Sequence, residues 1–388
     1  MTYQTPKIMI LYASYGDGHY QASKALEASF RSQGIADIVL LDLMAEAHPL
    51  LNELTKFVYM QSFRTLPLIY GWVYNATKEM QFETSPLGVI NSLGMGKLQQ
   101  TIDQIQPDII IHTFPQLAMP KLSKRTGKSL PLVNIVTDFD LHGRWIHPSV
   151  DRYYVATDDL KREMTSRGIP EGNVVVSGIP LKPDFFREPA PGGEIADRLD
   201  PRKKTVLLMA GAYGVMTGIR DICNRLVSSG RHQVVVVCGR NRNLHRGLSK
   251  QLGQHPDVHV YGYVSEVAAL MQACDCIITK PGGITLSEAL ACRLPIFLYK
   301  PVPGQELNNA LYLQQKGVAM VAEDSATLTG QIEALLSDEE HLAGVAREIE
   351  NLRRPEAAEA IVSDILRQWF APPEAELVLT AEGSSYIR

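Results

Sequence analysis

The chain has 388 residues, and since single cores stop growing at about 250–300 residues, two domains are expected. Apolar residues make up 45% and charged residues 21%, which excludes a mostly disordered or fibrous chain. The formal net charge of −4 supplies no overall basic field, so we expect no nucleic-acid partner, and any attraction to anionic lipid must be local.

The first half predicts parallel strands joined by crossover helices. Short β-branched runs alternate with amphipathic stretches, which is the pattern of an α/β protein. The strand candidates are residues 7–13, 37–41, 108–112, 132–137 and 153–157. Residues 7–13 run straight into a glycine-bearing turn without an apolar leader region, so we interpret them as a first strand and not as a signal peptide.

Residues 50–96 interrupt this pattern, because the segment is too long for one crossover and rich in aromatic side chains. Its apolar run, residues 66–74, is far shorter than the roughly 20 residues that cross a bilayer. Two interpretations stay open: ordinary core, or an interfacial element whose side chains enter the lipid below the headgroups. A basic cluster in the same domain could meet anionic headgroups or be a solvated helix end; it comprises Lys121, Lys124, Arg125 and Lys128.

The second half repeats the α/β pattern. The strand candidates are residues 205–210, 233–238, 258–261, 276–279 and 296–299. The expected domains are residues 1–186 and 204–338, joined by a linker at 187–203 and followed by helices at 339–370 and a loose tail at 371–388. Two doubly wound domains would face each other across a cleft, with ligands at the carboxyl ends of their strands.

All five cysteines lie in apolar stretches of the second half. They are Cys223, Cys238, Cys274, Cys276 and Cys292. Their odd number and close spacing predict buried thiols in a reducing cytosol, not disulfides or a zinc site.

The most informative motif lies at residues 279–289, where a strand candidate leads through Gly282-Gly283 into a helix. Unpaired N–H groups at a helix start carry the positive end of the helix dipole, so this turn predicts an anion site. Thr285 adds a hydroxyl in the first turn, and Glu288, one turn later, can bind a vicinal diol. The alternative is a glycine turn that only lets helix and strand pack.

Other strand ends would line the same cleft. Their polar and glycine residues are Gly211, Ala212, Tyr213, Arg240, Tyr263, Gln305 and Glu306. Each is a weak signal alone, and a polar pair such as Gln305-Glu306 is often only a solvated first turn. Several strand ends directed at one cleft favour a binding site more strongly than any one of them does.

Together these residues resemble the UDP-sugar half of the GT-B glycosyltransferases. The similarity to the family of bacterial processive diacylglycerol β-glucosyltransferases (family 28), which is related to the plant monogalactosyldiacylglycerol synthases, covers nearly the whole chain. It is carried by His142, Trp145, His147 and the segments 15–19, 134–139, 153–157, 209–212, 280–285 and 301–306. Asp17 and Asp140 depart from the family pattern.

The resemblance implies a role for each matching residue. Glu288 would hold the ribose hydroxyls, and Thr285 with the Gly282-Gly283 turn and Gly211 would hold the diphosphate. The hexose would be oriented by Gln305 and Glu306. The remaining UDP-sugar-binding candidates are Ala212, Tyr213, Arg240, Tyr263 and Ile284.

His19 is the expected catalytic base, because the start of a helix favours the neutral imidazole that can accept a proton. The alternative is a histidine bonded only to its own loop. Asp138 is a second catalytic candidate, expected to bind the acceptor or to orient His19. Although Asp138-Phe139-Asp140 spells the Asp-x-Asp of metal-dependent transferases, we expect no metal and no cofactor, since backbone donors would stabilise the leaving diphosphate.

The implied reaction is inverting transfer of glucose from UDP-glucose to diacylglycerol and onward to glucosyl-diacylglycerol. The product would be a membrane glycolipid and an anchor for lipoteichoic acid, made by a peripheral protein on the cytoplasmic face of the membrane. The residues expected to meet acceptor or membrane are Gly16, Gly18, Phe57, Ile69, Trp72 and Tyr74. The alternatives are a UDP-galactose-dependent or polyprenol-dependent enzyme of the same fold, a UDP-sugar epimerase, and a UDP-sugar-binding regulator without turnover.

Overall fold

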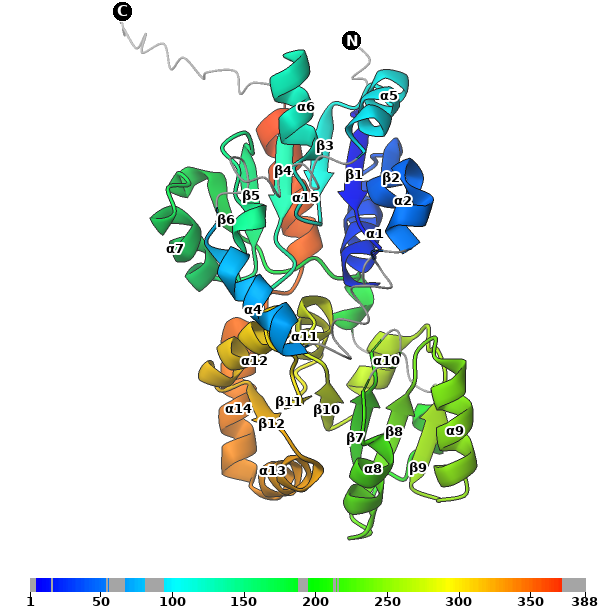
Figure 1. Ribbon diagram of the computed structural model, residues 1–388. Coiled ribbons are helices and arrows are strands. Elements are labelled where there is room, and N and C mark those ends of the chain that lie inside the picture. Colours follow the sequence, from blue (N-terminus) through cyan, green and yellow to red (C-terminus); the bar gives the residue numbers. More distant parts are fainter. Residues whose placement is uncertain are drawn as a thin grey trace, which may run out of the picture.

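Two parallel sheets of six strands each form the framework of the protein (Figure 1). The computed structural model describes residues 5–14, 17–53, 55, 67–80, 94–187, 195–211, 214 and 216–371. The strand orders are β2-β1-β3-β4-β5-β6 and β12-β11-β10-β7-β8-β9. Helices cover the sheets, which confirms the expected α/β class with two Rossmann-like domains.

The first sheet is built from the first half of the chain. Its strands are β1 (Ile8–Tyr12), β2 (Ile38–Asp42), β3 (Ile109–His112), β4 (Leu132–Ile135), β5 (Arg152–Val155) and β6 (Val174–Val176). The helices of this half are α1 (Asp17–Ser32), α2 (Leu43–Ala47), α4 (Pro67–Lys78), α5 (Met95–Ile105), α6 (Ala118–Thr126) and α7 (Asp158–Ser166). Short 3₁₀ helices are η2 (Gly143–Trp145), η3 (Glu171–Asn173), η4 (Pro183–Phe185) and η5 (Ala196–Arg198).

The second sheet follows from residue 204 onward. Its strands are β7 (Lys204–Met209), β8 (His232–Val237), β9 (Val258–Tyr261), β10 (Cys276–Thr279), β11 (Ile296–Tyr299) and β12 (Ala319–Ala322). The helices are α8 (Ile219–Val227), α9 (Arg242–Leu252), α10 (Val267–Gln272), α11 (Gly283–Ala291), α12 (Gln305–Gln315), α13 (Ser325–Ser337), α14 (Glu339–Leu352) and α15 (Ala357–Trp369).

All ten strands expected from the sequence form, with ends shifted by at most two residues. Strands β6 and β12 were not expected, and each lies at the edge of its sheet. Both are short and only partly buried, so they lack the long apolar run that marks a central parallel strand. The five cysteines are free thiols, but Cys274 and Cys292 are half-buried.

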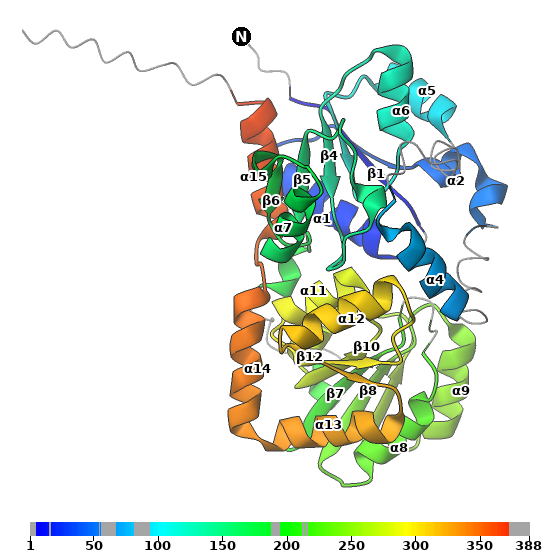
Figure 2. The same ribbon diagram turned by 60° about the vertical axis from the view of Figure 1, so that its left-hand side comes forward.

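Helix α15 belongs by packing to the first domain, although it follows the second in sequence (Figure 2). Its apolar side Ile361, Val362 and Ile365 shares a core with Phe30 of α1. The carboxylate of Asp364 accepts hydrogen bonds from Nε of Arg152, at 2.6 Å, and from the hydroxyl of Tyr154, at 2.8 Å. The chain therefore crosses between the domains a second time, which ties their orientation at the side away from α4.

Candidate active site

The two domains meet where α1 of the first faces α11 of the second (Figure 1). A Cβ atom built on Gly18 would lie 3.1 Å from Cγ1 of Ile284. One built on Gly283 would lie 2.1 Å from the carbonyl oxygen of Thr137. Gly18, expected at the acceptor, thus packs against the opposite domain, and two glycines let the helix starts approach each other.

His19 lies in the first turn of α1 and is half-buried. Its Nδ1 is 2.7 Å from the carbonyl oxygen of Thr113 and 3.1 Å from Oγ1 of Thr137. Since a carbonyl oxygen can only accept, we infer that Nδ1 carries the proton and that Nε2 presents its lone pair. Burial lowers the pKa of His19 to about 4, against the opposing bond to Thr113, so the ring is neutral at pH 7. This is the form that a general base requires.

Asp138 faces the second domain. Its Oδ1 accepts from Nε2 of Gln305 at 2.5 Å and from Nδ2 of Asn309 at 3.2 Å, both on α12. Burial raises the pKa of Asp138 to about 6, although the two amides oppose the shift. The expectation that Asp138 orients His19 is corrected here, because Thr113 and Thr137 hold the imidazole. Sequence reasoning missed both threonines, which carry no motif of their own.

Asn309 fastens the loop after β4 to the turn before α11. Its side chain is fully buried; Oδ1 accepts from the backbone N–H of Phe139 at 3.0 Å, and Nδ2 donates to the carbonyl of Pro281 at 3.1 Å. This residue was also missed. The available signal was the pair of adjacent asparagines early in a helix, a position that amide side chains do not favour unless they have partners.

The Gly282-Gly283 turn and Gly211 border open space at the ends of adjacent strands β10 and β7. A Cβ atom built on Gly211 or on Gly282 would meet no atom within 4 Å in the described part of the chain. Among the described side chains none caps the start of α11, so its first N–H groups can bind an anion.

Two residues of α11, Thr285 and Glu288, are half-buried and follow this turn. Burial raises the pKa of Glu288 to about 8; the positive charge of Lys182 lowers it, and the negative charge of Asp17 raises it. The carboxyl group therefore changes its charge near neutral pH.

The other expected sugar-binding residues lie around this turn and have protein partners. Gln305 donates to Asp138, as above. Oε2 of Glu306 accepts from the backbone N–H of Val302 at 3.1 Å and lies 3.6 Å from Nζ of Lys280. Glu306 thus holds the loop that precedes α12.

Arg240 forms a further bridge between the domains. Its Nη1 donates to Oδ1 of Asp17 at 2.9 Å, and its guanidinium lies 5.3 Å from the ring centroid of Tyr263. Four of the expected residues, Gly16, Phe57, Ala212 and Tyr213, lie outside the described residues.

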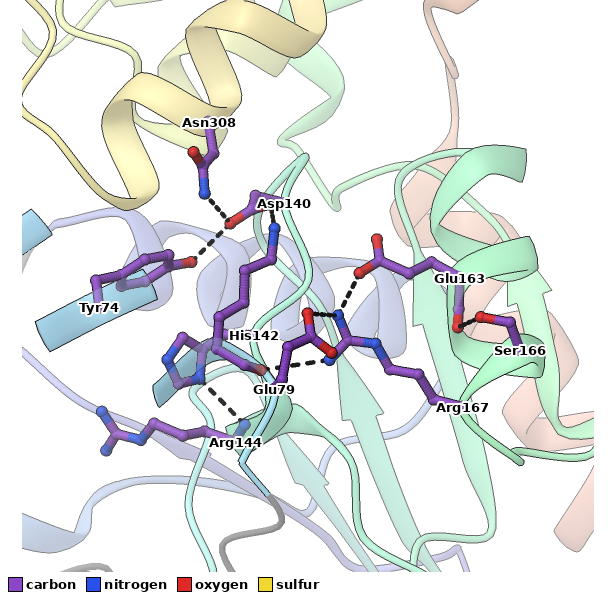
Figure 3. Close-up of polar contacts among 10 residues, drawn as sticks. Tyr74, Glu79, Asp140, His142, Arg144, Glu163, Ser166, Arg167 and Asn308 are labelled. Carbon is purple, nitrogen blue, oxygen red and sulfur yellow. Dashed lines mark hydrogen bonds and ion pairs between the residues drawn. The ribbon is translucent and has the colours of Figure 1, made fainter. Parts of the chain in front are cut away.

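Helix α4 turns one apolar side to solvent. Leu68 is 77% exposed and Trp72 is 72% exposed, and Ile69 and Val73 lie beside them on the same side. Tyr74 points the other way, with its hydroxyl 2.9 Å from Oδ2 of Asp140, so its placement with the membrane residues is corrected (Figure 3). None of the helices within the described residues is both long and apolar enough to cross a membrane.

Comparison with known proteins agrees with this geometry. The family model for monogalactosyldiacylglycerol (MGDG) synthase matches residues 19–181, and that for glycosyl transferases group 1 matches residues 194–351. A processive diacylglycerol beta-glucosyltransferase of Bacillus thuringiensis (strain Al Hakam) is 40% identical over 372 residues, covering 95% of this chain and 96% of the relative. The Bacillus cereus (strain AH187) enzyme of the same name is 40% identical over 374 residues, with the same coverage.

Solved structures share the architecture at low sequence identity. S. aureus MnaA, in a structure with UDP, has a TM-score of 0.64 at 15% identity and covers 93% of this chain and 96% of its own. Acinetobacter baumannii MurG has a TM-score of 0.59 at 15% identity and covers 93% and 100%.

Two Rossmann-like domains that meet at the carboxyl ends of their strands, with a glycine turn opening α11, define a GT-B glycosyltransferase fold. Within that class, the identity over nearly the whole length places the protein in one group. The chain belongs to the family of processive diacylglycerol beta-glucosyltransferases.

Proposed function

We propose that the protein transfers glucose from UDP-glucose to the hydroxyl of 1,2-diacylglycerol with inversion at the anomeric carbon, and then onto glucosyl-diacylglycerol. The observation that carries this proposal is the geometry of His19 in a chain of this family. Its Nδ1 is committed to Thr113 and Thr137, so Nε2 remains as the proton acceptor beside the start of α11. A fixed tautomer next to an anion-binding turn is what transfer to a hydroxyl requires.

In the proposed step, Nε2 of His19 takes the proton of the acceptor hydroxyl as its oxygen attacks the anomeric carbon. The new glycosidic bond forms on the face opposite UDP, and the bond from that carbon to the diphosphate oxygen breaks with its electron pair leaving on UDP. The N–H groups of the Gly282-Gly283 turn, the hydroxyl of Thr285 and the backbone at Gly211 offset the charge on the leaving group.

The second domain would provide the donor site. Glu288 would accept hydrogen bonds from the ribose hydroxyls, and Gln305 and Glu306 would orient the hexose. Arg240 and Tyr263, which stack on each other, would border the nucleotide. In the absence of donor, Gln305 is bonded to Asp138, so the hexose would exchange one hydrogen bond for another at the place where the domains meet.

We further propose that the protein acts at the surface of the cytoplasmic leaflet and attaches through α4. The exposed apolar side of that helix supports this, because such patches on a monomer mark interaction surfaces. The basic residues of α6 offer weaker support, since α6 lies toward the end of the first domain away from the cleft while α4 lies beside it (Figures 1 and 2).

The reaction is tested by incubating the purified protein with diacylglycerol vesicles and either radiolabelled UDP-glucose or UDP-galactose, and resolving lipids by thin-layer chromatography. We expect label from UDP-glucose in a first glycolipid and later in a more polar second one. Label from UDP-galactose alone would favour a galactosyltransferase. Binding of UDP without transfer from either donor would favour a regulator.

A further inference from the structure

Helix α4 has two sides with different neighbours. The exposed apolar side carries Leu68 and Trp72, and the opposite side rests on the loop before α12. A Cβ atom built on Gly71 would lie 2.4 Å from Cβ of Pro303, and one built on Gly304 would lie 3.2 Å from Cβ of Tyr74. This loop leads into Gln305 and Glu306, the residues proposed to orient the hexose. A helix proposed to meet lipid is therefore packed directly on the donor loop.

Asp140 is the polar centre of this contact (Figure 3). Its carboxylate accepts from the hydroxyl of Tyr74 at 2.9 Å, from Nζ of Lys78 at 2.5 Å and from Nδ2 of Asn308 at 2.9 Å. Tyr74 and Lys78 lie one turn apart on α4, and Asn308 lies on α12. One buried carboxylate of the first domain thus joins the membrane-facing helix to the donor domain.

The carboxyl end of α4 is fixed to the first domain by other residues. Nη1 of Arg167 donates to the carbonyl oxygen of Lys78 at 3.3 Å, and Nη2 pairs with Glu79 at 2.8 Å (Figure 3). The amino-terminal half of the helix leans on the second domain. Because α4 spans the two domains, its position depends on how they are arranged.

We propose that Asp140 is a positioning residue that couples attachment of α4 to a lipid surface with closure of the donor loop around UDP-glucose. The lipid surface and the donor both favour the same arrangement, in which α4, Asp140 and α12 are in contact. Linkage then requires that each ligand raise the affinity for the other by the same factor. This inference rests on the proposed function, and it adds that donor binding responds to the membrane even when no acceptor is present.

The experiment measures binding and not turnover. UDP-glucose is titrated calorimetrically into the full chain with and without phosphatidylcholine vesicles that lack diacylglycerol, and vesicle cosedimentation is measured with and without UDP-glucose. We expect vesicles to tighten UDP-glucose binding by about fivefold or more, the lower range of measured couplings, and the donor to tighten vesicle binding equally. Neutral lipid keeps headgroup charge out of the comparison.

Two substitutions test the residue. Asp140→Asn removes the charge paired with Lys78, and Asn308→Ala removes only the bond from α12 and leaves the carboxylate and Lys78 in place. Each should abolish the coupling while the protein still binds vesicles and UDP-glucose separately. Asn308→Ala also keeps the test decisive if Asp140→Asn fails to fold.

Asp159→Asn is the matched control. Asp159 also belongs to the first domain and also accepts a tyrosine hydroxyl and pairs with a lysine of the second, Tyr312 at 2.9 Å and Lys316 at 2.7 Å, both at α12 or its end. It has no bond to α4 in the described part of the chain. This variant should keep the coupling.

Equal affinity of the wild-type protein for UDP-glucose with and without vesicles overturns the proposal. Full coupling in both Asp140→Asn and Asn308→Ala overturns it as well, as does loss of coupling in Asp159→Asn to the same extent, since any contact between the domains would then suffice. The glucose-transfer assay is independent of these results, so failure of the coupling and failure of the proposed reaction are distinguishable.

Discussion

Gly283 and Thr137 are in backbone contact across the two domains: a Cβ atom at residue 283 would lie 2.1 Å from the carbonyl oxygen of residue 137. Thr137 is also the residue whose Oγ1 contacts Nδ1 of His19 at 3.1 Å. The start of α11 is therefore positioned directly on the segment that orients the proposed base. This relationship links the proposed donor site to the proposed catalytic residue without any flexible side chain between them.

Gly283→Ala should reduce turnover by about 100-fold, because the new methyl group forces the domains apart and a displacement of about 1 Å is enough for such a loss. UDP binding should change little, as the added Cβ points at the first domain. Steady-state kinetics and calorimetry measure the two effects. Gly344→Ala, where a Cβ would meet no described atom within 4 Å, is the control, and equal activity of both variants would contradict the prediction.

His19→Ala should lower turnover by about 10²–10⁴-fold, as expected for loss of a general base, while UDP affinity stays near wild type. The wild-type enzyme should keep its base active well below the ordinary histidine range, since burial lowers the pKa of His19 to about 4. The rate should fall only as pH approaches that value and Nε2 becomes protonated. If the variant kept half of the normal rate, Asp138 would be the next residue to test.

The affinity for UDP should rise with pH because of Glu288. Burial raises the pKa of this carboxyl group to about 8, so it is mostly protonated at pH 7 and ionised at pH 9. The carboxylate is the stronger acceptor for ribose hydroxyls, and if it alone binds them, affinity should increase about tenfold over this interval. The terminal phosphate of UDP is already ionised there, with a pKa near that of other phosphate monoesters at about 6.

Glu288→Gln is the control for this dependence. Its UDP affinity should be flat between pH 7 and pH 9 and lower than that of wild type at pH 9, by roughly the 1.5–3 kcal/mol of a charge-assisted hydrogen bond. Titration calorimetry at several pH values measures both. A wild-type affinity that is independent of pH would remove Glu288 from the ribose site.

We expect EDTA to leave the transfer rate unchanged and added Mg²⁺ or Mn²⁺ to be unnecessary. The physical reason is that the turns at Gly211 and Gly282-Gly283 would stabilise the leaving diphosphate, while the Asp140 oxygens are bonded to Lys78, Tyr74 and Asn308. Rates measured with EDTA and after adding each cation check this. Loss of activity in EDTA that manganese restores would reassign Asp138-Phe139-Asp140 to a metal site.

Replacing Ile69, Trp72 and Val73 together by serine should abolish vesicle binding while thermal unfolding stays near that of wild type. Each large side chain contributes roughly 1.5–3 kcal/mol when fully inserted into lipid and less when partly inserted. All three are exposed, so their loss leaves no cavity in the core. Vesicle sedimentation and thermal melting are measured together, and a collapsed melt would mean that these residues stabilise the fold.

Much of the fold could be predicted because parallel strands buried on both faces are encoded locally, as continuous β-branched runs followed by glycine turns. Residues 258–261, 276–279 and 296–299 agree with β9, β10 and β11 at both ends. The edge strands β6 and β12 could not be found in this way, since one-sided burial leaves a short and mixed pattern.

The tertiary structure alone decided how the apolar stripe of α4 is used and what surrounds the proposed base. An apolar stripe at helical spacing is the same in a core helix and in an interfacial one, and only packing showed Trp72 turned to solvent and Tyr74 to Asp140. The sequence by itself determined the α/β class, the glycine turns and the candidates His19 and Glu288, because these follow from short-range patterns. The partners Thr113, Thr137 and Asn309 became visible only in three dimensions, since hydrogen bonds between residues about 90–170 positions apart leave no local trace in the chain.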